Sequence, residues 1–111
     1  MIAIAKRLES IKDKGGLLLV DVANVLGTRP ETVSRWNQGR AFPHPATERL
    51  LLELEWIVDQ LSDFYEPKEA RMWLFSRQKL FDGKSPAELI SEGKTEEVLA
   101  AIRQLRDSVF V

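Results

Sequence analysis

Residues 22–39, which read VANVLGTRPETVSRWNQG, contain the pattern that decides the fold of this chain. Ala23 is small enough to let a second helix cross the first closely, and Gly27, four residues later, suits the tight turn between them. Val33 and Trp36 follow at a spacing that places both side chains on one face of the second helix. The stretch therefore predicts a helix-turn-helix whose second helix is anchored on the core by Val33 and Trp36.

The second helix of this pair has a polar face on the side opposite its apolar anchors. Arg35 and Gln38 lie on that face, and their side chains end in groups that can read base edges in the major groove of DNA. Arg29 and Arg40 flank the helix, where they can hold phosphates. The alternative is a plain helical hairpin with a solvated polar face. The predicted DNA-binding residues are Arg29, Glu31, Thr32, Ser34, Arg35, Gln38 and Arg40.

The charge distribution favours a nucleic-acid partner for the first part of the chain only. Residues 1–45 carry seven Lys and Arg against four Asp and Glu, a net charge of +3. Residues 46–111 carry nine against thirteen, a net charge of −4. A polyanion such as DNA is attracted to the first part and repelled by the second. The net positive charge of residues 1–45 is small, so it supports DNA binding but does not establish it.

Composition narrows the class of protein further. With 44% apolar residues, three tryptophans and five phenylalanines in 111 residues, the chain can bury the core of one compact globular domain. No apolar run reaches the roughly 18 residues of a membrane span, and the first residues lack the order of a signal peptide. The chain has no cysteine, which excludes disulfides and thiolate metal sites. We therefore expect a cytoplasmic protein.

No arrangement of residues indicates catalysis. The single histidine, His44, lies between two prolines in a predicted loop, where a solvated side chain is the usual outcome. Neither a glycine-rich phosphate loop nor a spacing typical of metal ligands occurs. We predict no catalytic residue, no metal site and no cofactor.

Apolar residues recur at helical spacing along the rest of the chain, and no segment reads as a strand. The longest predicted helix covers residues 46–65, and its apolar stripe is broad enough to pack on two sides. Ser85 is a predicted cap for a short helix, and Thr95 opens the last one. We predict an all-α chain, with a helix-turn-helix bundle and its long central helix in residues 1–65. A small helical domain follows in residues 66–111.

The second part of the chain has a pattern of its own. In order, its elements are Ala70-Arg71, Trp73-Leu74, Leu80, Gly83, Ser85-Pro86, Leu89-Ile90, Gly93 and Val98-Leu99. Together with the upstream segment, which resembles the Xre-type helix-turn-helix through TVSRW, they resemble the Xre/MbcA/ParS-type antitoxins over nearly the whole chain. The final VFV resembles the MbcA branch of that family. The chain departs from the family pattern at Ser76-Arg77, where many relatives have Pro-Asn, and at Asp82, where many have glycine.

This resemblance implies a non-enzymatic antitoxin that self-associates and neutralises a RES-domain toxin, which consumes NAD by degrading it or by transferring ADP-ribose. Such antitoxins commonly repress their own operon. The implied partners are a cognate RES-domain toxin, operator DNA and a second copy of the chain, with no membrane. The alternative function is an ordinary dimeric Xre-type repressor, in which Trp56, Trp73 and Phe75 pack in the core. The resemblance implies toxin contacts at Arg77, Lys79, Phe81, Val109, Phe110 and Val111.

The chain ends on apolar residues that a core does not explain. Val109 continues the inward stripe of the last helix, formed with Val98, Ile102 and Leu105. Residues 110 and 111 fall about 120° and nearly 180° away from that stripe, at about 100° per residue. We expect them to enter the toxin's NAD site, with the terminal carboxylate against groups that otherwise hold the cofactor's phosphates. The alternatives are that the terminal phenylalanine folds back onto the core or packs in a homodimer.

Overall fold

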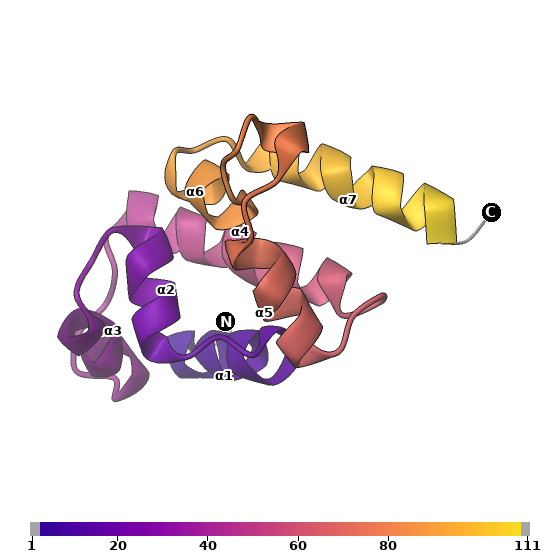
Figure 1. Cartoon of the computed structure of the whole chain (residues 1–111). Helices are drawn as coiled ribbons and strands as arrows, with labels where there is room; N and C mark the ends of the chain where they lie inside the picture. The colour runs from indigo at the N-terminus through magenta and orange to yellow at the C-terminus, as the bar shows by residue number, and fades with distance from the viewer. Residues whose placement is uncertain (1–2, 110–111) are drawn as a thin grey trace.

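The computed structural model describes residues 3–109 as helices packed around one long central helix (Figure 1). The described residues contain no strand, and one isolated bridge pairs Gln78 with Lys84. The all-α prediction is confirmed. The elements are α1 (Ile4–Gly15), α2 (Leu19–Leu26), α3 (Pro30–Asn37), α4 (Pro45–Leu61), α5 (Pro67–Phe75), the 3-10 turn η1 (Lys79–Phe81), α6 (Pro86–Ser91) and α7 (Thr95–Val109).

Glycine and proline set many of the helix boundaries. Gly16 and Gly27 end α1 and α2 in the left-handed conformation, with φ of 66° and 69°, which glycine adopts at little cost. The end of α2 at Gly27 agrees with the predicted turn. Other helices begin on a proline, whose missing N–H has no helical partner to lose at that position. These prolines are Pro30, Pro45, Pro67 and Pro86.

Helix α4 forms the centre of the fold. Its residues Leu51, Leu54 and Ile57 are completely buried, and α1, α2, α6 and α7 all pack against it. Gly15, at the end of α1, lies so close that a Cβ atom there would come within 2.7 Å of a Val58 methyl group. Only glycine allows this approach without displacing the neighbouring side chain. The expected burial of α4 on two sides is confirmed.

Helix α4 is shorter than predicted, because it ends at Leu61 rather than at Tyr65. The chain continues in turns, and the N–H of Phe64 bonds to the Leu61 carbonyl three residues earlier, at 3.0 Å. Glu66 is extended, with ψ of 159°, since the residue before Pro67 is disfavoured from the helical conformation. The proline therefore separates α4 from α5 by a turn that periodicity alone does not show.

The buried apolar side chains of the described residues belong to one cluster, which includes residues of both predicted regions. Helix α5 packs on α1, and α6 packs on α2 and α4. The division at residue 65 therefore separates two sequence patterns that share a core. The molecule is elongated, 45 × 25 × 22 Å, with α3 near one end and the C-terminal end of α7 at the other (Figure 1).

A buried carboxylate links α2 to α5. Asp21 is only 6% exposed and accepts hydrogen bonds from Arg71 Nε at 3.1 Å, from Arg71 Nη2 at 2.9 Å and from the Leu18 N–H at 2.9 Å. Burial alone raises the pKa of Asp21, but these hydrogen bonds and the Arg71 charge outweigh it, so the pKa lies below its ordinary value. The pair therefore stabilises the chain fully above the unfolded pKa of about 3.9, and this stabilisation is lost as pH falls through the folded pKa.

We predict that Arg71→Ala lowers the free energy of unfolding by about 1–3 kcal/mol, because it leaves a buried carboxylate with only the Leu18 N–H as partner. Urea denaturation at neutral pH measures the change. Lys68→Ala is the matched control, since Lys68 is exposed on the same helix. It should change stability by less than about 0.5 kcal/mol. Equal effects of the two substitutions would contradict a stabilising role for the pair.

Candidate functional site

Helices α2 and α3, the two helices predicted as a helix-turn-helix, pack against each other. Ala23 and Val33 are completely buried, and Trp36 is 5% exposed, so the small residue and both apolar anchors lie where the sequence predicts. The Thr28 N–H bonds to the Ala23 carbonyl at 3.0 Å and closes the turn. Arg29 is extended, with φ of −93° and ψ of 149°, and α3 begins at the next residue without a side-chain cap.

The predicted DNA-binding residues lie together on the outer side of α3. Glu31, Arg35 and Gln38 are exposed, whereas Thr32 and Ser34 are half-buried. The Gln38 amide lies 3.5 Å from the Ser34 hydroxyl, which is a long contact that leaves the amide accessible. We name this surface the recognition face, formed by Arg29, Glu31, Thr32, Ser34, Arg35, Gln38 and Arg40.

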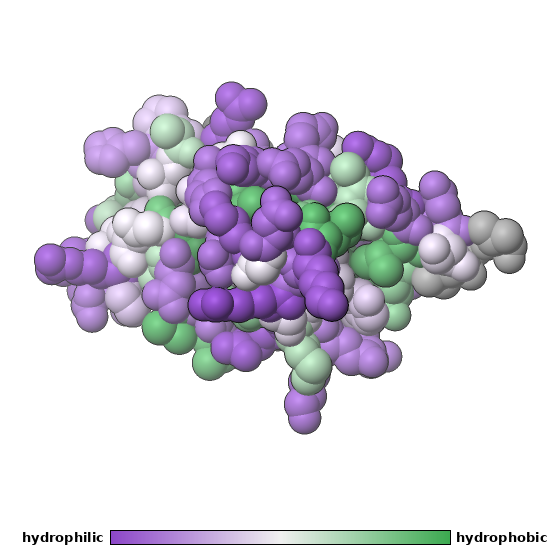
Figure 2. All heavy atoms as spheres, turned by 45° about the horizontal axis from the view of Figure 1, so that its top comes forward, coloured by the Kyte–Doolittle hydropathy of each residue, from purple (hydrophilic) through white to green (hydrophobic). Residues whose placement is uncertain are grey.

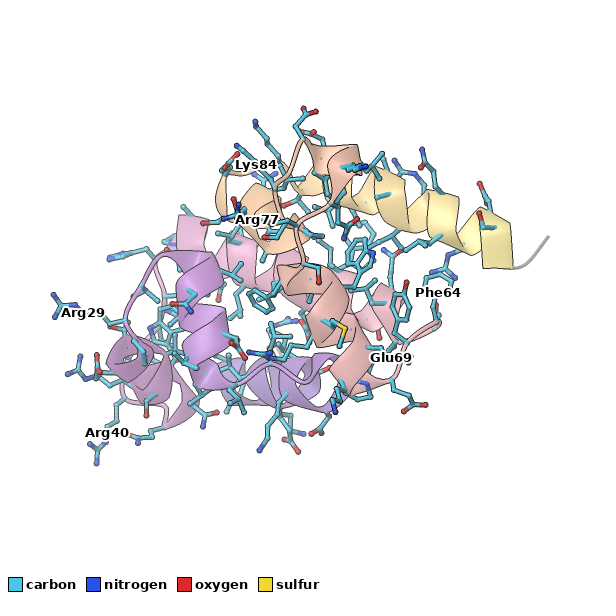
Figure 3. The ribbon with its side chains drawn as sticks, viewed as in Figure 1. Arg29, Arg40, Phe64, Glu69, Arg77 and Lys84 are labelled. Atoms are coloured by element: carbon cyan, nitrogen blue, oxygen red, sulfur yellow. The ribbon has the colours of Figure 1, made fainter. Side chains whose placement is uncertain are left out.

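The recognition face is the basic end of the molecule. Arg29 and Arg40 extend from the two ends of α3 away from the body (Figure 3). Within residues 3–109, neither they nor Arg35 takes part in an ion pair. A solvated guanidinium without an acidic partner keeps its donors for a phosphate or a base edge. From Gly27 to Pro45, Glu31 is the only acid in the sequence.

Three of the predicted toxin-contact residues lie in the segment between α5 and α6. They differ in their exposure to solvent. Arg77 and Lys79 are exposed, whereas Phe81 is 8% exposed and belongs to the core. Phe81 anchors η1, so its ring is not part of the surface in this conformation. Its predicted contact with a toxin stays a prediction, as do those of Arg77 and Lys79. The exposed apolar side chain of η1 is Leu80, at 61%.

The turn after η1 explains the departure from the family pattern at Asp82. Among the described residues Asp82 alone has a positive φ without being glycine, at 56°. Aspartate tolerates this left-handed conformation better than most residues do. The Gln78 N–H bonds to the Lys84 carbonyl at 3.1 Å across the loop. The turn therefore forms with aspartate where many relatives have glycine.

Helix α7 leads toward the remaining predicted contacts. Ile102 is completely buried and Leu105 is half-buried, so the inward stripe is present as far as Leu105. The backbone is helical as far as Val109. The side chain of Val109 and all of Phe110 and Val111 lie outside the described residues, and their predicted contacts stay predictions.

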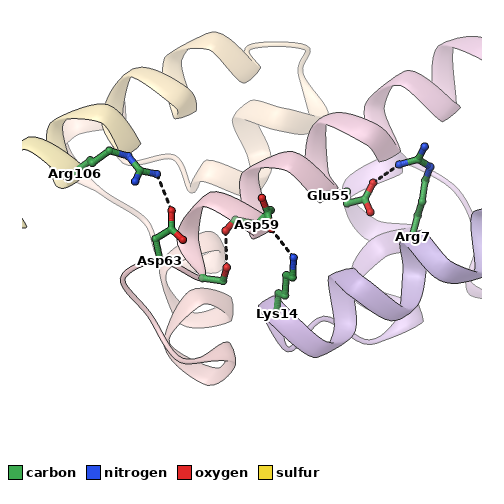
Figure 4. Close-up of polar contacts among 7 residues, drawn as sticks. Arg7, Lys14, Glu55, Asp59, Asp63 and Arg106 are labelled. Carbon is green, nitrogen blue, oxygen red and sulfur yellow. Dashed lines mark hydrogen bonds and ion pairs between the residues drawn. The ribbon is translucent and has the colours of Figure 1, made fainter. Parts of the chain in front are cut away.

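Polar contacts attach α7 to α4 and to the turn after it. Near its start, Thr95 donates a hydrogen bond to Glu53 at 2.7 Å. Near its end, Arg106 donates to Asp63 at 3.1 Å (Figure 4), and its guanidinium lies 5.0 Å from the centre of the Phe64 ring. These contacts attach α7 to the rest of the fold at Thr95 and at Arg106. The last turns of α7 extend beyond the other helices (Figure 1).

The sequence did not predict the surface of mixed polar and apolar side chains between α5 and α7. Figure 2 shows hydrophobic side chains interrupting a largely hydrophilic surface on this side of the molecule. Helical periodicity gives these residues the same signal as core residues, so no pattern distinguishes them. We name this surface the α5–α7 groove, lined by Trp73, Gln78, Leu80, Ala101, Gln104, Leu105 and Ser108.

The described residues contain no group of three or more His, Cys, Asp or Glu side chains placed to hold a metal ion. His44 is exposed. None of the described helices combines the length and apolar character that crossing a membrane requires.

No family model matches the chain. The mycobacterial cidal antitoxins MbcA of Mycobacterium bovis and Mycobacterium tuberculosis are each 29% identical to it, over 97% of this chain and 96% of theirs. A probable mycobacterial cidal antitoxin of M. tuberculosis is 30% identical over 86% of this chain and 82% of its own length. A chain in the crystal structure of the M. tuberculosis MbcT–MbcA toxin–antitoxin complex matches with a TM-score of 0.84 and 28% identity, and the match covers all of both chains. The likeness therefore includes both the recognition face and α7.

Proposed function

Because the chain belongs to the MbcA-type family of antitoxins, we propose that it binds and neutralises a partner toxin of the RES-domain kind. The observation that carries this proposal is the end-to-end structural match to a chain of a toxin–antitoxin complex. The family is one of antitoxins and not of enzymes, so the function of this chain is binding.

The toxin contacts lie on the side of the molecule formed by α5, η1 and α7. Leu80 and Met72 are 61% and 62% exposed there, and the α5–α7 groove offers the half-buried ring of Trp73. The exposed cations Arg77 and Lys79 lie before and within η1. An apolar centre with charged residues around it is the usual composition of a protein–protein interface, and large aromatic residues contribute much of the binding energy.

The C-terminal end blocks the toxin's NAD site. This part of the proposal is supported by α7, which is attached by Thr95 and Arg106 and whose described end extends beyond the other helices. A phenylalanine ring suits a site built for a planar base, because aromatic rings pack against planar rings. Occupation of that site excludes the cofactor.

We predict that this chain restores the NAD content and the growth of a bacterial host that expresses the RES-domain toxin encoded in the same operon. The toxin alone should deplete NAD. Metabolite extraction after induction measures the effect, and size-exclusion chromatography of the co-expressed pair shows the complex. Depleted NAD despite full expression of both proteins would contradict the proposal.

Deletion of residues 109–111 should abolish neutralisation while it leaves the melting temperature and DNA binding unchanged. The physical reason is that the proposal assigns these residues to the contact with the toxin. The toxin's NAD consumption, measured with purified proteins, reports the loss. Arg35→Ala, at the opposite end of the molecule, is the control and should neutralise normally. A truncated chain that still inhibits the toxin would exclude the blocking role of the tail.

We infer a second function, repression of an operon through the recognition face. The observation that favours it is the presentation of Arg29, Arg35 and Arg40 without acidic partners around an exposed helix of a helix-turn-helix. In this class of motif the second helix enters the major groove and flanking basic residues hold the backbone. An ordinary repressor shares this property but lacks a toxin, so the NAD experiment separates the two functions.

Arg35→Ala should weaken binding to a duplex of the chain's own promoter by about 1–3 kcal/mol, because a bidentate contact to a base is lost. Fluorescence anisotropy at fixed salt measures the affinity. Arg103→Ala removes an exposed arginine of α7 and should have no effect beyond the general salt dependence. Equal affinities of the wild type and Arg35→Ala would rule out this assignment.

A further inference from the structure

The segment between α3 and α4 carries the most exposed large apolar side chain of residues 3–109. Phe42 is 76% exposed, more than Met72 at 62% and Leu80 at 61%. Ala41, directly before it, is half-buried and packs against the core. The segment therefore turns its small residue inward and leaves most of the aromatic ring in water. A single exposed apolar residue is common on protein surfaces, so the surroundings of Phe42 decide what its exposure indicates.

The surroundings of Phe42 in the sequence are basic and contain no acid. Residues 32–47 include no Asp or Glu, whereas Arg35 and Arg40 within this stretch are exposed. Arg40 extends away from the body of the molecule (Figure 3) and belongs to none of the ion pairs of the described residues. It precedes Phe42 by two residues, so their Cα atoms are at most about 7 Å apart. The ring therefore lies at the edge of the recognition face.

The backbone around Phe42 is held in one conformation. The Arg40 N–H bonds to the Arg35 carbonyl at 2.9 Å, which ties the start of the segment to the end of α3. Phe42 precedes Pro43, and a residue before proline is disfavoured from the helical conformation. His44 is extended for the same reason, with ψ of 155°. The segment is therefore ordered before it meets a partner, which lowers the entropy lost on binding.

We propose that Phe42 contacts the DNA duplex bound by the recognition face, with its ring against sugars and base edges beside the phosphate that Arg40 holds. The inference rests on the proposed repression of an operon. When the second helix of such a pair enters the major groove, the residues that follow it lie close to the adjoining backbone. A phenylalanine there packs on sugars and thymine methyl groups, which are the apolar surfaces that a duplex offers.

The charge around Phe42 favours DNA over a protein as the occupant of this surface. A stretch that carries only cations is complementary to a polyanion, and the recognition helix that binds it is the preceding element. A toxin bound at the C-terminal end of α7 lies at the opposite end of a molecule 45 Å long (Figure 1). Phe42 is therefore a DNA contact of a different physical kind from the arginines, because it neutralises no phosphate.

The dependence of DNA affinity on salt tests the proposal. Fluorescence anisotropy with a duplex of the chain's own promoter, at several salt concentrations, gives the affinity and its slope against log salt. Phe42→Ala should weaken binding about tenfold at every salt concentration without changing the slope, because an apolar contact releases no counterions. Arg40→Ala should reduce the slope by about one. Lys68→Ala, which removes an exposed cation of α5, is the control and should change neither quantity.

Three results would overturn the inference in different ways. Wild-type affinity of Phe42→Ala, with Arg35→Ala weakened, would exclude the contact and leave repression intact. A reduced slope for Phe42→Ala would attribute its loss to displaced phosphate contacts and would reject the apolar contact. A wild type that does not bind the promoter duplex would end both the inference and the proposed repression.

A second set of measurements separates DNA from a protein partner. Phe42→Ala should keep the wild-type melting temperature, because the side chain is mostly exposed, and it should inhibit the toxin normally. Phe42→Leu should recover part of the DNA affinity, since it restores a branched apolar side chain. The heat capacity change of DNA binding, measured by calorimetry, should become less negative in Phe42→Ala. Lost toxin inhibition with full DNA affinity would assign Phe42 to a protein interface and overturn the proposal.

Discussion

The burial of α4 on two sides is the constraint on which the rest of the structure depends. Leu51, Leu54 and Ile57 are completely buried, and each such side chain contributes about 1.5–3 kcal/mol through removal from water. Helix α1 reaches one side of α4 because Gly15 allows contact with Val58, while α6 and α7 cover other parts of it. With these neighbours in place, α3 precedes α4 at one end and α7 extends past its other end.

Directional polar contacts fix how the helices are oriented on this core. Apolar burial does not depend strongly on direction, whereas a hydrogen bond to a carboxylate does. The Arg71 bonds to Asp21 join residues 50 apart in sequence and hold α5 against the helix-turn-helix. The Arg106 bond to Asp63 is exposed and contributes little stability, so its role is to orient α7.

Much of the fold could be predicted because periodicity, proline and glycine act locally. The apolar spacing of Val33 and Trp36 identified a buried helix face, and the predicted turn at Gly27 was correct. The recognition face followed from the same spacing, since the opposite side of a packed helix is exposed. The prediction of a toxin partner came from the resemblance to a known family. It did not come from the physical properties of residues 66–111, because no single residue there indicates a toxin.

The sequence could not predict which individual apolar side chains are buried. Burial depends on which helix packs over a side chain, and local sequence does not contain that information. Trp56 and Ile57 are adjacent and both apolar, yet one is half-exposed and the other completely buried. Phe81 is buried while Leu80 beside it is exposed, because only one of them faces the core when η1 packs. Periodicity identifies candidates for burial, and the arrangement of the other helices then selects among them.

The positions of the two proposed binding surfaces determine how they can influence each other. The recognition face and the C-terminal end of α7 lie at opposite ends of a molecule 45 Å long, and one apolar cluster connects the helices between them. A toxin bound at the proposed C-terminal site and DNA bound at the recognition face would not compete for the same surface. The hydrogen bonds between Arg71 and Asp21 join α5 to α2 between these two ends, so the two proposed surfaces belong to one connected core.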